Sequence, residues 1–162
     1  MIPKNSKKTA GFTMIEMAIV AVLVGVLATL AVPLFSRTLP RLKCHAEARN
    51  LLNSVRIARS RAIAENTQYG VYFDTNARTY LIFKDIVNQT LFRYNNGDSI
   101  IVGPVELDAN VVFTGTTFTA STLVMLPTGA ASETGTVGVN TSSGDTPYTI
   151  SVLAATGKTK LQ

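Results

Sequence analysis

"KKTAGFTMIEMAIVAVLVGVLATLAVPLF", residues 7–35, decides the fold of this chain. From Met17 to Phe35 the stretch carries no charge. At about 1.5 Å of rise per residue, such a helix spans a hydrocarbon core of about 30 Å. Glu16 stands beside this run, although a carboxylate in mid-bilayer costs roughly 2.5–3.5 kcal/mol on insertion scales. A simple anchor would carry no such residue, so we expect Glu16 to have a partner.

Three lysines precede the apolar run, at positions Lys4, Lys7 and Lys8. By the positive-inside rule they place the amino end on the cytoplasmic side, and the rest of the chain then lies across the membrane. The residues that follow position 37 suffice for one compact domain and are too few for two.

The excess of positive charge belongs to the middle of the chain. The whole sequence has a formal net charge of +5. From Arg37 to Asn66 there are seven basic residues against two acidic ones, whereas from Thr67 onward there are five against seven. A slightly acidic C-terminal domain argues against a broad nucleic-acid footprint, although a small local patch is compatible with it.

Cysteine and histidine, which often ligate metals or take part in catalysis, are scarce in this chain. Cys44 is the only cysteine, so it pairs with another chain or stays an unpaired helix residue. His45 is the only histidine, and no cysteine or carboxylate cluster has metal-ligand spacing with it. We therefore expect no metal, no cofactor, no catalytic residue and no enzymatic activity.

The segment from Leu42 to Asn66 has the pattern of an amphipathic helix. Apolar residues recur there at spacings of three and four: Ala48, Leu51, Val55, Ala58 and Ala62. Polar side chains, Arg49 and Arg56 among them, occupy the opposite face. Pro40 is expected to interrupt the helix near the membrane surface. The apolar stripe should rest on a sheet.

After Asn66 the chain reads as short strands separated by turn residues. The segments "YGVYFD" and "TYLIFK" flank "TNAR" and predict one hairpin. A second hairpin is predicted from "TLFRY" and "SIIVGPVEL" around "NNGD", because Asn-Gly accepts the positive φ angles of a tight turn. Four further strand-like segments follow. The expected fold class is α+β, with a long, partly transmembrane helix packed on an antiparallel, sandwich-like head.

The N-terminal stretch resembles a known processing signal. A basic leader ends in Gly11, Phe12 follows, Glu16 is the fifth residue after the glycine, and the apolar helix comes next. An ordinary secretory signal fits poorly, because Ala-Val-Pro is a weak cleavage site and the apolar run is long. The pattern is similar to the class III signal of type IV pilins and pseudopilins, whose helices often carry a glycine and a proline at the offsets of Gly25 and Pro33.

This resemblance implies cleavage between Gly11 and Phe12 by a prepilin peptidase, followed by N-methylation of Phe12. The carboxylate of Glu16 would then neutralise the new amine of a neighbouring subunit. The alternative is that Glu16 reaches back to the cytoplasmic interface. Gly25 and Pro33 would bound a segment that bends or unwinds when the subunit leaves the bilayer, or Pro33 is a tolerated kink.

Three further segments resemble the GspH/FimT group of minor pilin-like proteins: "NSVRIARSRAIAEN", "LVMLPTGAASETGTVGV" and "YTISVLAATGKTK". The resemblance implies a pilin-like fold with four parts: a leader (1–11), a transmembrane and assembly helix (12–36), its amphipathic continuation (37–66) and a β-rich head (67–162). It also implies an inner-membrane protein whose head lies in the periplasm.

Two functions follow from this resemblance. The first is a minor subunit of a type II secretion or type IV filament machine, with the prepilin peptidase, other pilins or pseudopilins and the inner-membrane assembly platform as partners. The alternative is a pilus protein that binds DNA through a terminal basic element, here Gly157 to Lys160. In that element Lys158 and Lys160 replace arginines, and lysine lacks the planar fork that grips phosphate. These lysines otherwise mark an exposed edge strand.

Overall fold

The computed structural model describes residues 11–162, apart from the side chains of residues 33, 34 and 37. The leader lysines therefore lie outside the described residues. The chain divides into two compact units, residues Met1–Thr38 and Leu39–Gln162, and each is considered by itself below.

A single helix, α1, runs from Met14 to Glu65. Its helical assignment continues through Gly25, Pro33 and Pro40, so the expected interruption at Pro40 is wrong. Each proline lacks the amide hydrogen that would bond one turn back, which weakens the helix without ending it here. That Gly25 and Pro33 bound a segment that unwinds stays a prediction.

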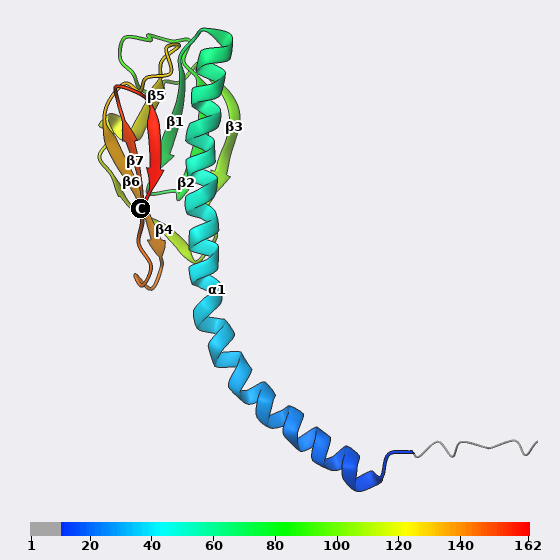
Figure 1. Ribbon diagram of the computed structural model, residues 1–162. Helices are drawn as coiled ribbons and strands as arrows, with labels where there is room; N and C mark the ends of the chain where they lie inside the picture. Colours follow the sequence, from blue (N-terminus) through cyan, green and yellow to red (C-terminus); the bar gives the residue numbers. More distant parts are fainter. Residues whose placement is uncertain (1–10) are drawn as a thin grey trace, which may run out of the picture. The chain divides into compact units, whose positions relative to one another are not determined.

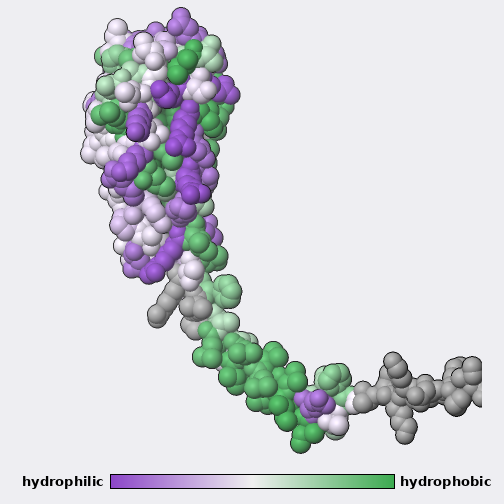
Figure 2. Space-filling view, viewed as in Figure 1, coloured by the Kyte–Doolittle hydropathy of each residue, from purple (hydrophilic) through white to green (hydrophobic). Residues whose placement is uncertain are grey.

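The first part of α1 is apolar on its whole circumference. The window Met14–Val32 is long and apolar enough to cross a membrane, and none of it is buried by the residues that the structure describes. Figure 2 shows this part as an almost unbroken hydrophobic surface. A helix that is hydrophobic all round belongs in lipid or among other protein chains, not in water.

The head is built from two four-stranded antiparallel sheets that lie beside the second part of α1 (Figure 1). The first has the order β3-β2-β1-β5 and the second the order β4-β6-β7-β8. A short 3-10 helix, η1, precedes β5. The bounds are β1 Tyr69–Asp74, β2 Thr79–Lys84, β3 Ser99–Glu106, β4 Val111–Thr116, η1 Thr119–Ser121, β5 Thr122–Met125, β6 Gly135–Thr141, β7 Tyr148–Leu153 and β8 Lys158–Leu161.

One predicted hairpin is confirmed and the other is wrong. β1 and β2 pair antiparallel around the expected turn, with Asp74 opposite Thr79. The segment 90–94 is not a strand, and β3 pairs with β2 instead. Around Gly97 only an isolated bridge forms, between Asn96 and Asp98.

The carboxylate of Asp98 explains why the second hairpin does not form. Its Oδ1 accepts the backbone amides of Ile86 and Val87 at 3.1 and 3.0 Å, and its Oδ2 accepts that of Asn95 at 2.8 Å. These amides therefore bond to a side chain instead of a neighbouring strand. Residues 85–98 form a loop organised around one carboxylate.

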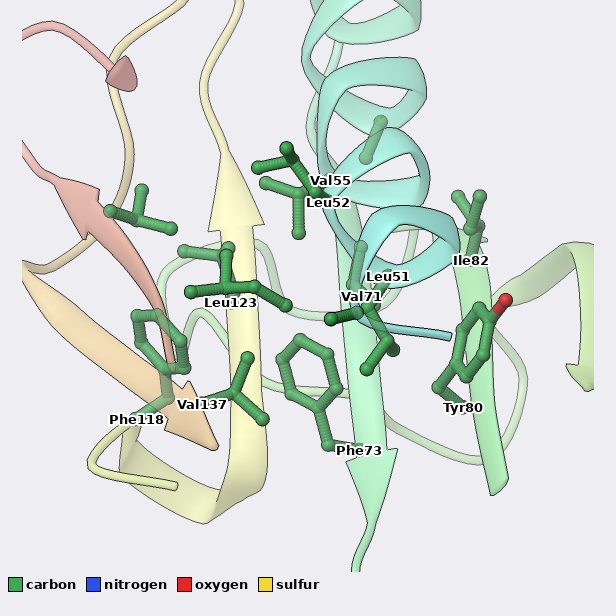
Figure 3. Close-up of a cluster of buried hydrophobic side chains, with 14 of the residues drawn as sticks. Leu51, Leu52, Val55, Val71, Phe73, Tyr80, Ile82, Phe118, Leu123 and Val137 are labelled. Carbon is green, nitrogen blue, oxygen red and sulfur yellow. The ribbon is translucent and has the colours of Figure 1, made fainter. Parts of the chain in front are cut away.

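The core lies between α1 and both sheets (Figure 3). The predicted stripe is confirmed, because Ala48, Leu51, Val55, Ala58 and Ala62 are all fully buried. Facing them are Val71 and Phe73 of the first sheet and Val137 of the second, with Phe118 stacked 6.1 Å from Phe73. One helix face thus closes both sheets into a single core.

The first sheet is also covered on its other face. Leu81, Phe83 and Val124 form a second apolar cluster there. Tyr94, from the loop 85–98, packs over it, with its ring centroid 5.3 Å from that of Tyr72 and 5.1 Å from that of Phe83. The loop that replaced the predicted hairpin therefore acts as a lid on this cluster.

Cys44 belongs to the core stripe, one turn before Ala48. It is fully buried, and its thiol contacts the carbonyl of Thr146 at 3.5 Å. Burial, helped by the charge of Glu47, raises the pKa of this thiol. A disulfide with another chain would need this thiol exposed, so Cys44 is a packing residue in the folded head.

Asp85 is a fully buried carboxylic acid at the end of β2. Its Oδ1 has no hydrogen-bond partner among the described residues. Gln68, with its amide nitrogen turned toward the loop, donates to Oδ2 at 3.2 Å. Burial, followed by the nearby charge of Asp98, raises the pKa of Asp85 to about 6.

This raised pKa predicts a dependence of stability on pH. Because the folded state holds the Asp85 proton more tightly than the unfolded chain does, the free energy of unfolding should fall as pH rises from about 4 to about 6. Asp85→Asn should remove this decline and stabilise the head at neutral pH. Urea unfolding followed by tyrosine fluorescence at several pH values measures both effects.

The exposed Asp145→Asn is the matched control, and it should leave the decline in place. An unchanged pH profile in Asp85→Asn would show that Asp85 titrates normally.

Candidate functional site

The start of α1 carries a reciprocal hydrogen-bond pattern. The amide of Glu16 donates to Thr13 Oγ1 at 3.2 Å, and the amide of Thr13 donates to Glu16 Oε2 at 3.5 Å. This is a capping box, in which a threonine and a glutamate three residues later satisfy two otherwise unpaired helix donors. The pattern Thr13-x-x-Glu16 is the sequence signal that predicts this box.

The predicted processing residues lie just outside the helix. Gly11 and Phe12 are non-helical, and the Phe12 residue is 78% exposed. An exposed, irregular segment is what a peptidase needs in order to bind the backbone. Further along, a Cβ added at Gly25 would meet nothing within 4 Å among the described residues, so none of their contacts requires glycine there.

A groove runs between α1 and the edge strand β8 in the head. Its walls carry Arg49 and Arg56 on the helix and Lys158 and Lys160 on the strand. Hydrophilic side chains follow the visible face of α1 and the strand beside it (Figure 2). The predicted basic residues of the C-terminal element therefore do meet helix arginines.

Arg59 lies in the same groove but has a structural task. Its Nε donates to the carbonyl of Gly129 at 2.8 Å, and its Nη2 donates to the carbonyl of Thr156 at 3.0 Å. The guanidinium thus joins the loop before β6 and the turn before β8 to the helix. Hydrogen bonds from a charged donor to otherwise unpaired carbonyls are worth about 1.5–3 kcal/mol each.

Two glycines allow this close approach. Gly157 has a φ of +59°, and a Cβ there would overlap the carbonyl oxygen of Gly129. Gly129 has a φ of +80°, and a Cβ there would lie 2.9 Å from Ile63 Cδ1 and 3.3 Å from Arg59 Nη2. Both positions require a residue without a side chain, for conformation and for space.

Three motifs that are far apart in the sequence therefore meet at one point. They are the helix element around Arg59, the late Pro-x-Gly turn at Gly129 and the terminal element that begins at Gly157. All three motifs are visible in the sequence, but no local pattern predicts that the arginine bonds the two turns. We call this arrangement the Arg59 clamp.

A family model for type II transport protein GspH matches residues 47–156. The chain belongs to this family. A second model, the prokaryotic N-terminal methylation motif, matches residues 6–32. The GspH match covers the Arg59 helix element and the Gly129 turn, and the methylation motif covers Gly11, Phe12 and Glu16. No curated protein matches this GspH-family chain significantly in sequence.

Solved structures of two proteins share the fold. The minor pseudopilin EpsH from the Type 2 Secretion System of Vibrio cholerae is 12% identical, with a TM-score of 0.56 over 74% of this chain and 96% of EpsH. The type IV minor pilin FimU of Pseudomonas aeruginosa is 14% identical, with a TM-score of 0.53 over 73% of this chain and 91% of FimU. The pilin-like architecture predicted for this GspH-family chain is confirmed.

The Arg59 clamp makes a stability prediction. Gly157→Ala should destabilise the head by about 1–3 kcal/mol beyond the cost of positive φ alone, because its methyl group overlaps the Gly129 carbonyl that accepts the hydrogen bond from Arg59. Gly144→Ala is the matched control, since Gly144 has a φ of +81° and nothing within 4 Å of an added Cβ. Urea unfolding of both variants measures the difference. Equal losses in the two variants would contradict the clamp.

Proposed function

We propose that this chain is a minor pseudopilin of a type II secretion machine, held in the inner membrane by the first part of α1 until it is assembled into a periplasmic filament. The head then lies in the periplasm, and the prepilin peptidase, the assembly platform and other pseudopilins are its partners. The observation that carries the proposal is the combination of a GspH-family head with an N-terminal methylation motif on one continuous helix.

Cleavage after Gly11 would create the positively charged group that assembly uses. Cleavage of the Gly11–Phe12 bond leaves an ammonium on Phe12, close in sequence to the apolar part of α1. An unpaired ammonium and an unpaired carboxylate are each costly in a low-dielectric setting, and they attract strongly when they pair. Glu16 is the acidic residue of that segment. It would pair with the Phe12 amine of an adjacent subunit and set the register between helices.

The capping box is a competing explanation for Glu16, because capping requires no neighbour. The two roles make different demands. Glutamine at this position still caps a helix but carries no charge. Thr13→Ala removes one half of the capping box and keeps the carboxylate.

These two variants test the proposal. Glu16→Gln should lower incorporation into filaments by at least about tenfold, because the charge pair is lost while the cap is kept. Thr13→Ala should leave incorporation within about twofold of the unchanged chain. Quantitative immunoblotting of sheared or crosslinked filaments, normalised to membrane levels, measures both.

Equal loss in the two variants would assign Glu16 to capping. Full incorporation of Glu16→Gln would exclude a charge pair as the assembly device.

DNA binding at the groove is a second candidate, because Lys158 and Lys160 lie beside Arg49 and Arg56. It has less support. Arg59, the remaining arginine of the groove, already bonds two carbonyls. Lysine lacks the bidentate geometry of arginine, and the head from Thr67 onward carries more acidic than basic residues. The matched family is named for type II transport and not for nucleic-acid uptake.

A further inference from the structure

The edge of the second sheet has unused backbone groups at β8. Thr149 and Gln162 exchange both backbone hydrogen bonds, each at 2.9 Å. Since hydrogen-bonded and non-hydrogen-bonded pairs alternate in an antiparallel ladder, Lys158 and Lys160 bond to β7, while the amides and carbonyls of Thr159 and Leu161 point away from it. Within residues 11–162, no strand pairs with this side of β8. Such an edge is a template for one more strand.

The cations around this edge have no acidic partner among the described residues. Arg49, Arg56, Lys158 and Lys160 are all exposed, and none forms an ion pair within the described part of the chain. The residues that line the groove include no acidic side chain. Low-dielectric walls that carry one sign of charge concentrate the field in a cleft, so this groove attracts anionic groups.

Two of the other sheet edges, β3 and β4, are less suitable. The pairing of β3 shifts register, and Pro104 in this strand has no amide to donate. The pairing of β4 shifts register beside Gly115. β8 pairs regularly along its whole length.

We propose that the groove between α1 and β8 binds an acidic, extended segment of another protein subunit, which adds as a strand to the free edge of β8. The backbone groups of Thr159 and Leu161 pair with that segment, and alternate carboxylates lie opposite Lys158 and Lys160. The opposite face of the segment meets α1 near Arg56, whose Nε already donates to Thr159 Oγ1 at 3.4 Å.

An added β-strand would use more of the binding groups in the groove than a nucleic acid would. Phosphates would use the cations but not the alternating donors and acceptors of Thr159 and Leu161. A peptide uses both. The lysines, which would deter a random edge-to-edge contact, favour an acidic strand over a neutral or basic one. The free edge of β8 is also only one short strand, Lys158–Leu161, which matches a short extended peptide.

The test is a binding titration with the full chain in detergent micelles. The probe is a fluorescent eight-residue peptide with blocked ends, in which glutamate and threonine alternate. Fluorescence anisotropy should show saturable binding that weakens with salt. A peptide with lysine in place of glutamate should not bind. The glutamate peptide with N-methyl groups on alternate backbone nitrogens should lose binding by about tenfold or more, because the edge pairing is blocked.

Variants of the groove locate the site. Lys158→Gln with Lys160→Gln, and separately Arg49→Gln with Arg56→Gln, should each weaken binding by about tenfold. Arg93→Gln, an exposed arginine that does not line the groove, is the matched control and should bind as the unchanged chain does.

Four outcomes would overturn the proposal: no binding of the glutamate peptide, equal binding of its N-methylated form, no effect of the groove variants, or tighter binding of a single-stranded DNA of the same net charge. The assay requires no filament, so its failure would leave the proposed assembly function untouched.

Discussion

The apolar surface of α1 has to be removed from water in two different ways along its length. From Cys44 to Ala62 the stripe on α1 is fully buried by the two sheets of its own head, whereas Met14–Val32 has no cover within the chain. Apolar surface left in water costs roughly 25 cal/mol per Å². The first part of α1 therefore needs lipid or other protein chains as its surroundings.

The charged side chains differ in role between the two parts of α1. In the head, Arg49, Arg56, Lys158 and Lys160 lie where α1 meets β8, while Arg59 bonds two turns to the helix. Beside the apolar segment, the carboxylate of Glu16 completes a capping box. The proposed pairing with a processed Phe12 adds a second role to this carboxylate. The capping role is seen within the chain, and the intersubunit role is the one proposed above for the same carboxylate.

Local patterns in the sequence predicted the parts of the fold that depend on local physics. The stripe from Ala48 to Ala62 and the β1–β2 hairpin were both read correctly, because periodicity and turn residues determine them. Cys44 was missed as a stripe member because a lone cysteine was judged by its redox chemistry. The second hairpin failed because the Asp98 carboxylate accepts the amides of Ile86 and Val87, a contact across the loop that no turn rule contains. The Arg59 clamp likewise joins residues that only the folded chain brings together.

The central claim is that a newly formed amine on Phe12 enters an apolar environment and is neutralised there. Mass spectrometry of the mature protein, isolated from the filament or membrane of its native host, tests this most directly. The account predicts a chain that begins at Phe12 and carries a methyl group on its terminal nitrogen. A mature chain that retains residues 1–11 would contradict it.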